Sequence, residues 1–181
     1  MMTHPEAEWR AVARDIPGPV VLLGKFLLPL SLLAPLATII GMMVFDTGWN
    51  AEYGYSILRD RAPVIAIATY AFEIISVLML ATVFHFLARI EGRSAGFVPA
   101  LQVAVFGSIP LLLSGVTLFI PFNVIISMVA MFYSFYLYYL GVSRLLGIRP
   151  SDATMFVGVT MICMLVLSGF MGGLASMLGI Y

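Results

Sequence analysis

The sequence has little of several residue types on which soluble domains and metal sites depend. Only 10% of its 181 residues are charged, and it has one cysteine, Cys163, and two histidines, His4 and His85. A single cysteine excludes a disulfide framework and any multi-cysteine metal or iron–sulfur site. Neither histidine has a second histidine three or four positions away, so a paired-histidine metal or haem site is not supported.

Other signatures of activity are missing as well. Nine Lys and Arg residues balance nine Asp and Glu residues, and no basic run occurs, which argues against nucleic acid as a partner. The sequence has no Gly-rich phosphate loop and no acid in position to orient His85 for Ser/His/Asp catalysis. We therefore expect no catalytic residue, no metal site and no cofactor, and a protein that is not an enzyme.

Apolar residues, in contrast, make up 62% of the chain. About 20 predominantly apolar residues cross a hydrocarbon core roughly 30 Å thick. The uncharged stretch from Ser94 to Ser143 is too long for one crossing, and Pro121 suits the first turn of a new helix after a break. The chain then divides into five predicted spans, at residues 20–45, 62–88, 97–118, 121–142 and 153–177. The expected fold is an all-α integral membrane protein with a five-helix transmembrane bundle.

The basic residues are distributed unevenly between the two sides of this bundle. With the N-terminus in the cytoplasm, only Arg59 and Arg61 lie outside. The other seven basic residues lie on the cytoplasmic side: Arg10, Arg14, Lys25, Arg89, Arg93, Arg144 and Arg149. Because cytoplasmic loops carry an excess of Lys and Arg, we expect a cytoplasmic N-terminus and a C-terminus outside.

Residues 1–19 are predicted to form a cytoplasmic segment, separate from the transmembrane domain at 20–181. A helix in this segment would place Trp9, Val12 and Ile16 on one face. This pattern predicts a short amphipathic helix lying in the membrane interface, with Trp9 as its anchor. The alternative is a frayed polar tail in which the tryptophan is incidental.

Glu73 is the only acid placed deep within a span. It lies within about 3 Å of the predicted midplane, where an ionised carboxylate is costly. We expect Glu73 to be neutral at pH 7 and to bond a hydroxyl group on the third or fourth span. Ser108, Tyr133 and Ser134 complete this predicted intramembrane polar site. Three roles stay open: a fastener between helices, a handler of protons or cations, and a contact with a partner subunit.

The fourth span carries a run of tyrosines toward its cytoplasmic end. Tyr136 and Tyr139 are predicted to be interface anchors, since an aromatic ring with a polar tip suits the headgroup zone. Tyr133 and Tyr136 share one face of the helix, so binding of a lipid or a partner is the alternative for these two.

The fifth span carries small residues at Gly169, Gly172 and Gly173. Glycines four apart let two helix backbones approach closely in a membrane. We expect these glycines to pack against another helix of the same chain, with homo-oligomerisation or a protein partner as the alternative.

Prolines interrupt two of the predicted spans, at Pro29 and Pro35 in the first and at Pro110 in the third. Each removes a backbone hydrogen bond and bends its helix. Bent helices can open a cavity for a substrate, although they are also common in bundles that transport nothing.

The segment Tyr133-Ser-Phe-Tyr-Leu-Tyr-Tyr-Leu-Gly141 and the residues after it, through Ala153, resemble the Yip domain family in its bacterial branch. These are Ypt/Rab-interacting membrane proteins. The Trp-containing segment at 9–15, the proline-rich first span and Pro110 fit the same pattern. The resemblance covers nearly the whole chain and implies five spans and a bacterial inner membrane. It supplies no catalytic residue, and the Asp-Leu-Tyr-Gly-Pro signature of the eukaryotic members is missing.

Taken together, these features predict a non-enzymatic protein that organises a membrane, as a scaffold or as an accessory subunit of a membrane complex. Its expected partners are membrane lipids and a protein or second copy bound through helix faces. The alternative is a small transporter, channel or lipid-moving protein that uses Glu73.

Overall fold

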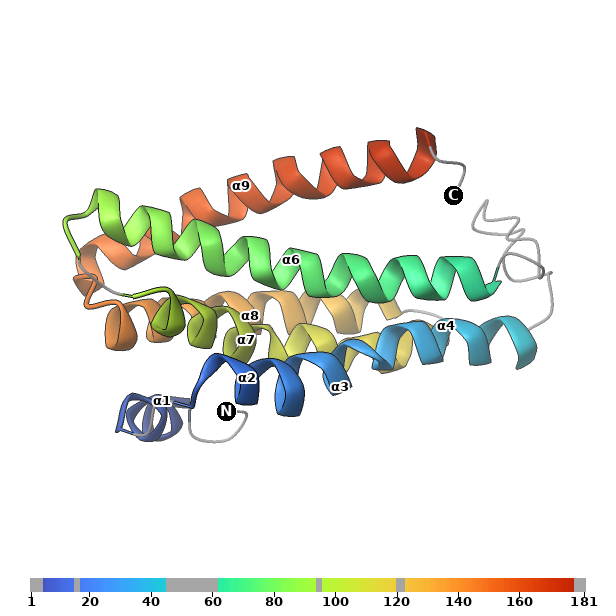
Figure 1. Cartoon of the computed structure of the whole chain (residues 1–181), viewed down its shortest axis with the longest axis horizontal. Helices are drawn as coiled ribbons and strands as arrows, with labels where there is room; N and C mark the ends of the chain where they lie inside the picture. The colour runs from blue at the N-terminus through green and yellow to red at the C-terminus, as the bar shows by residue number, and fades with distance from the viewer. Residues whose placement is uncertain (1–4, 15–16, 45–61, 94–95, 120–122, 178–181) are drawn as a thin grey trace.

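The computed structural model describes residues 5–14, 17–44, 62–93, 96–119 and 123–177. All secondary structure in these residues is helical, as the sequence predicts. Figure 1 shows long helical stretches lying lengthwise beside one another and a short helix, α1, across one end. The elements are α1 (Pro5–Arg14), α2 (Pro19–Val21), a π-helical segment (Leu22–Leu27), α3 (Leu28–Ser31), α4 (Leu33–Val44), α6 (Ala62–Ile90), α7 (Phe97–Ser114), a 3-10 segment (Gly115–Phe119), α8 (Asn123–Leu145) and α9 (Pro150–Met177).

The first long stretch, α2 to α4, changes helix type where its prolines require it. Proline has no N–H, and its ring collides with the carbonyl group four residues earlier. Lys25 stands four residues before Pro29, inside the π-helical segment, where the Leu28 N–H bonds the Leu23 carbonyl instead. Ser31 stands four residues before Pro35, and the helix is interrupted directly after it. The predicted bending of this span therefore has a local cause at each proline.

Four helical stretches are long and apolar enough to cross a membrane: Pro19–Gly41, Pro63–Ile90, Phe97–Thr117 and Val124–Leu145. In α9 a shorter apolar stretch, Pro150–Val166, stands beside them. The third span is the central one. In its most apolar stretch 67% of the residues are buried, whereas the share is 22% to 33% in the other three spans. Pro121 and the turn between the third and fourth spans lie outside the described residues.

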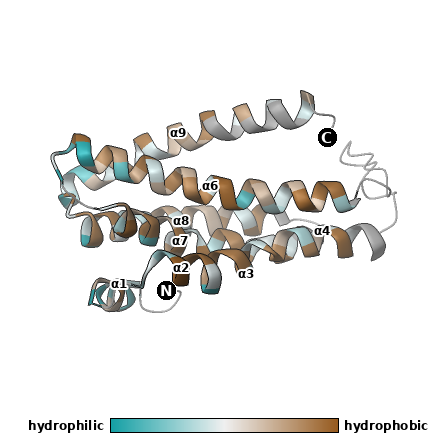
Figure 2. Cartoon of the chain, viewed as in Figure 1, coloured by the Kyte–Doolittle hydropathy of each residue, from teal (hydrophilic) through white to brown (hydrophobic). Residues whose placement is uncertain are grey.

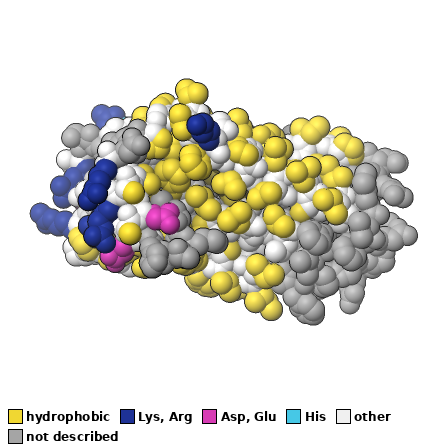
Figure 3. Space-filling model, turned by 90° about the horizontal axis from the view of Figure 1, so that it is seen from below, with side chains coloured by type: hydrophobic (Ala, Val, Ile, Leu, Met, Phe, Trp, Pro, Cys, Tyr) yellow, Lys and Arg dark blue, Asp and Glu magenta, His cyan; other side chains and the backbone are white. Residues whose placement is uncertain are grey.

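Polar residues gather at the end of the bundle where α1 lies, which we name the α1 end (Figure 2). The C-terminal ends of α6 and α8 and the start of α9 meet there, and so do the described arginines of the chain. Figure 3 shows Lys and Arg side chains grouped there, with a mostly hydrophobic surface beside them. These arginines are Arg10, Arg14, Arg89, Arg93, Arg144 and Arg149. Arg59 and Arg61, predicted for the opposite side, lie outside the described residues.

Five buried aromatic side chains form the centre of the packing, and we name them the ring core. Phe84 of α6 stacks on Phe156 of α9 at 5.9 Å and meets the edge of Tyr138 of α8 at 5.5 Å, between ring centroids. Phe106 of α7 meets Trp9 of α1 edge to face at 6.4 Å. Because each ring comes from a different helix, the ring core ties α1, α6, α7, α8 and α9 together.

Candidate functional site

A buried hydrogen bond lies beside the ring core, between α7 and α8. The hydroxyl oxygens of Ser108 and Tyr138 are 2.8 Å apart, and Ser108 also donates to the Ala104 carbonyl at 2.7 Å. A serine hydroxyl has one proton to donate, so the Tyr138 hydroxyl is the donor to Ser108. Both hydroxyl groups of the pair therefore have hydrogen-bond partners inside the bundle.

Gly107 makes room for Tyr138. A Cβ atom on Gly107 would overlap Cδ1 and Cε1 of the tyrosine ring, so only glycine lets the ring lie against α7 here. Tyr138 is not among the predicted site residues, because a run of tyrosines near the end of a span is typical of aromatic residues at the membrane interface. The signal was present, since Tyr138 follows Ser134 by four residues and lies on the buried face of α8, whereas Tyr136 is exposed.

Glu73 does not join this pair. Its Oε2 atom is buried and has no hydrogen-bond partner among the described residues. Phe84, which packs on Tyr138, lies eleven residues farther along α6, or about 16 Å at the helical rise. The predicted bond from Glu73 to a hydroxyl group on the third or fourth span is thus not found at Oε2 among the described residues. Similar predicted depths along two helices do not by themselves pair Glu73 with Ser108, since Ser108 bonds Tyr138, which packs on Phe84.

The other two members of the predicted polar site, Ser134 and Tyr133, belong to α8. Ser134 is buried, one turn from Tyr138, and its Oγ has no hydrogen-bond partner among the described residues. Tyr133 is half-buried, and its ring lies 6.1 Å from that of Tyr136. The structure thus shows Ser108 bonded to Tyr138 and Tyr133 packed on Tyr136, and the grouping of the four predicted residues into one site stays a prediction.

Trp9 is not in the environment that the sequence predicts for an interface anchor. Its side chain is completely buried, against Phe106 and directly over Gly141 of α8. A Cβ atom on Gly141 would lie 2.8 Å from Cζ2 and Cη2 of the indole ring. The amphipathic helix α1 does form, but its apolar face packs on protein because Gly141 leaves a recess that fits the ring.

Gln102 of α7 is a buried polar residue that the sequence analysis missed. It is completely buried, and its Nε2 donates to the carbonyl of Pro17, in the linker after α1, over a long 3.5 Å. Within the described ranges, its Oε1 has no hydrogen-bond partner, and neither does the buried Nε1 of Trp9. A glutamine in an otherwise apolar span was the available signal.

The predicted helix-packing glycines are open where the structure describes them. No atom lies within 4 Å of a Cβ built on Gly169 or Gly173, so packing within the chain is not found at these two positions among the described residues. Gly172 belongs to α9, but its surroundings lie outside the described residues. Contact with a second copy or a partner stays a prediction.

Tyr136 is 44% exposed, and Tyr139 packs partly against the core. Their predicted role as interface anchors stays untested. No group of three or more His, Cys, Asp or Glu side chains is arranged to hold a metal ion in the part of the chain that is described.

Long apolar helices, a buried aromatic centre and polar residues gathered at one end define a multi-pass helical membrane protein. The Yip1 domain matches residues 1–171, and the chain belongs to that family. The match confirms the resemblance at the family level. The two segments that carry it, around Trp9 and at Tyr133–Gly141, contact each other in the structure. No match to the chain is found among curated proteins or among solved structures.

Proposed function

We propose that this protein organises its membrane through the outer surfaces of its helices, as a scaffold or an accessory subunit, and performs no chemistry of its own. The observation that carries the proposal is the division between a filled interior and an apolar outside. The ring core occupies the interior, and the Ser108–Tyr138 pair is satisfied within it. Large apolar side chains on the spans remain exposed, such as Val129 of α8 at 65% and Leu165 of α9 at 71%.

Exposed apolar faces of this kind suit lipids and neighbouring transmembrane helices, which associate by close packing in a membrane. The test is site-specific photocrosslinking in the native membrane, with a photoreactive side chain at Val129 or Leu165. Recurrent protein or lipid adducts at these positions support the proposal. The matched control is buried Val142, where adducts are expected only within the chain. Equal yields of foreign adducts at all three positions would contradict it.

A second candidate, movement of protons, ions or lipids, has one specific observation in its favour. The Oε2 atom of Glu73 is buried in a membrane-spanning helix without a hydrogen-bond partner among the described residues. Such carboxyl groups commonly mark proton or ion pathways. Proton-coupled flux in reconstituted vesicles that disappears in Glu73→Gln would establish this candidate and overturn the scaffold proposal.

For the orientation, we propose that the α1 end faces the cytoplasm of a bacterial inner membrane. The grouping of the six described arginines at that end supports this choice, by the positive-inside rule. In a Cys163→Ala background, Gly92→Cys in the α6–α7 link should react with an impermeant maleimide only after cells are opened. Met177→Cys, at the other end, should react in intact cells. The reverse pattern would invert the topology.

A further inference from the structure

The junction between α1 and the bundle combines a close fit with unsatisfied polar groups. The fit is apolar: the Trp9 ring covers Gly141 and meets Phe106 edge to face. Val103 of α7 lines the same place, since its Cγ1 would lie 3.1 Å from a Cβ on Gly141. This recess, formed by Val103, Phe106 and Gly141, holds the only completely buried side chain of α1 among its described residues.

Two buried polar atoms at this junction have no hydrogen-bond partner in the part of the chain that the structure describes. They are the donor Nε1 of Trp9 and the acceptor Oε1 of Gln102, both on completely buried side chains. Gln102 also holds the linker after α1 by a single long bond, to the carbonyl of Pro17. A buried polar group without a partner lowers the stability of the state that buries it. Docking of α1 is therefore favoured by shape and opposed by these two atoms.

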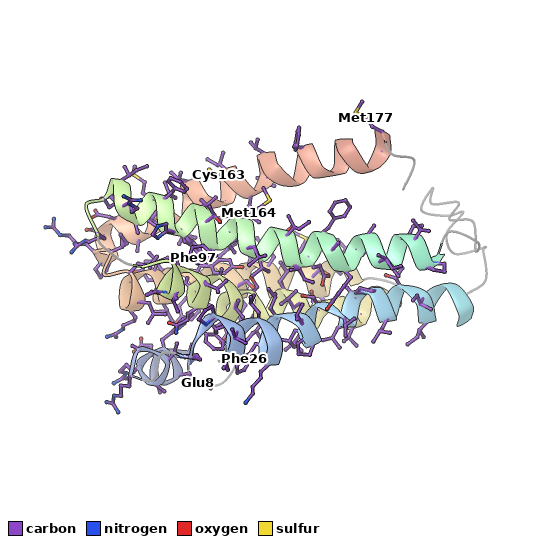
Figure 4. The ribbon with its side chains drawn as sticks, in the orientation of Figure 1. Glu8, Phe26, Phe97, Cys163, Met164 and Met177 are labelled. Carbon is purple, nitrogen blue, oxygen red and sulfur yellow. The ribbon has the colours of Figure 1, made fainter. Side chains whose placement is uncertain are left out.

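The membrane interface offers α1 what the docked position lacks. An indole ring at the headgroup level keeps its apolar body in the lipid while its N–H finds an acceptor. Glu6, Arg10 and Arg14 follow one another four residues apart and form an exposed polar side of α1 next to the Trp9 face. Figure 4 shows Glu8 on the same helix. Helix α1 packs mainly on α8, so its release breaks few other contacts between helices.

We infer that α1 is a reversible latch with two positions. In one position Trp9 occupies the recess of Val103, Phe106 and Gly141. In the other, α1 lies on the phospholipid surface with Trp9 among the headgroups, and the recess at the α1 end is uncovered. Release of Trp9 breaks its contact with Phe106 but leaves the other three rings of the ring core in place, because Phe84 packs on Tyr138 and Phe156 without Trp9.

The test follows Trp9 fluorescence in vesicles made with phospholipids brominated near the headgroup end of their acyl chains. Trp49→Phe leaves Trp9 as the only tryptophan and serves as the parent protein. Quenching reports the released position, since bromine reaches the indole only in lipid. The parent is expected to show partial quenching. Gly141→Val fills the recess and should raise quenching to its maximum, whereas Gly158→Val, at a helical glycine with open surroundings, should match the parent.

Gln102→Met is a second test, in which quenching is expected to change in the direction opposite to that of Gly141→Val. It leaves the recess open to Trp9. Gln102→Met removes the unpartnered Oε1, which favours docking, and also the long 3.5 Å bond to the carbonyl of half-buried Pro17, which opposes it. Because an unpaired buried acceptor costs more than a long neutral hydrogen bond contributes, the ratio of released to docked protein should fall about fivefold from the parent value. Parent quenching equal to that of Gly141→Val would show that α1 is never docked in a membrane. No quenching in the parent, or no change in Gln102→Met, would show a fixed α1. Any of these results overturns the latch.

Discussion

The ring core and the C-terminal part of α9 are both rich in apolar side chains but differ in whether these side chains are buried. We name residues 162–177 the α9 tail. In the ring core, Phe84 and Trp9 are completely buried and Phe156 is 6% exposed. In the α9 tail, Leu165 and Phe170 are 71% and 65% exposed. Helix α9 has both a buried and an exposed aromatic side chain, since Phe156 and Phe170 both belong to it and lie about four turns apart.

The difference lies in the partners of the small residues. At the α1 end, Gly107 admits the ring of Tyr138 and Gly141 admits the ring of Trp9. In the α9 tail, Gly169 and Gly173 have no atom within 4 Å of a built Cβ. Figure 1 shows α9 diverging from α6 toward its C-terminus, and Figure 4 shows Met177 there, pointing away from the other helices. A glycine therefore tightens a membrane bundle only where a large side chain fills the space it leaves.

The largest expected effect comes from removing one ring in each region. Phe84→Ala should lower the free energy of unfolding by about 3 kcal/mol, because the cavity leaves Tyr138 and Phe156 without their shared neighbour. Phe170→Ala should change it by less than about 0.5 kcal/mol, since lipid replaces the lost contacts. Both are measured by sodium dodecyl sulfate titration in mixed micelles. Equal effects would erase the distinction between the two regions.

The next effect comes from adding one methyl group at each kind of glycine. Gly107→Ala should destabilise the protein by about 2 kcal/mol, because its Cβ overlaps the buried ring of Tyr138. Gly158→Ala, where no described atom lies within 4 Å, should be neutral or stabilising by up to about 1 kcal/mol through helix propensity. The same titration compares them. A harmless Gly107→Ala would mean that Tyr138 can leave its place at little cost.

The sequence was sufficient to predict the class of fold because length and hydropathy act locally along each helix. A charge every few tens of residues marks the ends of the spans, and the described helices α6, α7 and α9 lie over three of the predicted ones. The amphipathic pattern around Trp9 likewise predicted the helix α1. Such features need no knowledge of neighbouring helices.

Contacts between helices were beyond the same reasoning, because they depend on how far one helix is shifted along another. Glu73 and Ser108 have similar predicted depths, yet Ser108 pairs with Tyr138. The sequence also does not say whether the apolar face of α1 meets lipid or protein, since an indole ring suits both. The structure shows the protein-bound position, in which Trp9 lies on Gly141, and this contact joins residues more than 130 positions apart.

A smaller effect is expected from the hydrogen bond beside the ring core. Tyr138→Phe keeps the ring that fills the space at Gly107 and removes only the hydroxyl that donates to Ser108. Hydrogen bonds between membrane helices contribute about 0.6 kcal/mol on average, so a loss of about 0.5 to 1 kcal/mol is expected. Tyr136→Phe, at the exposed neighbour, is the control and should have no measurable effect. In the double variant Tyr138→Phe/Ser108→Ala, the effects should be less than additive, as expected for a shared bond.

The smallest effect is expected at Glu73, the one deep acid in the described spans. If Glu73 held two helices together, Glu73→Gln would lose a hydrogen bond between them. The Oε2 atom of Glu73, however, has no hydrogen-bond partner among the described residues. Glutamine keeps the size of the side chain, so the free energy of unfolding should change by less than about 0.5 kcal/mol. The titration used for Tyr138→Phe provides the scale. A loss larger than that of Tyr138→Phe would mean that Glu73 holds helices together, and that the packed region extends beyond the ring core.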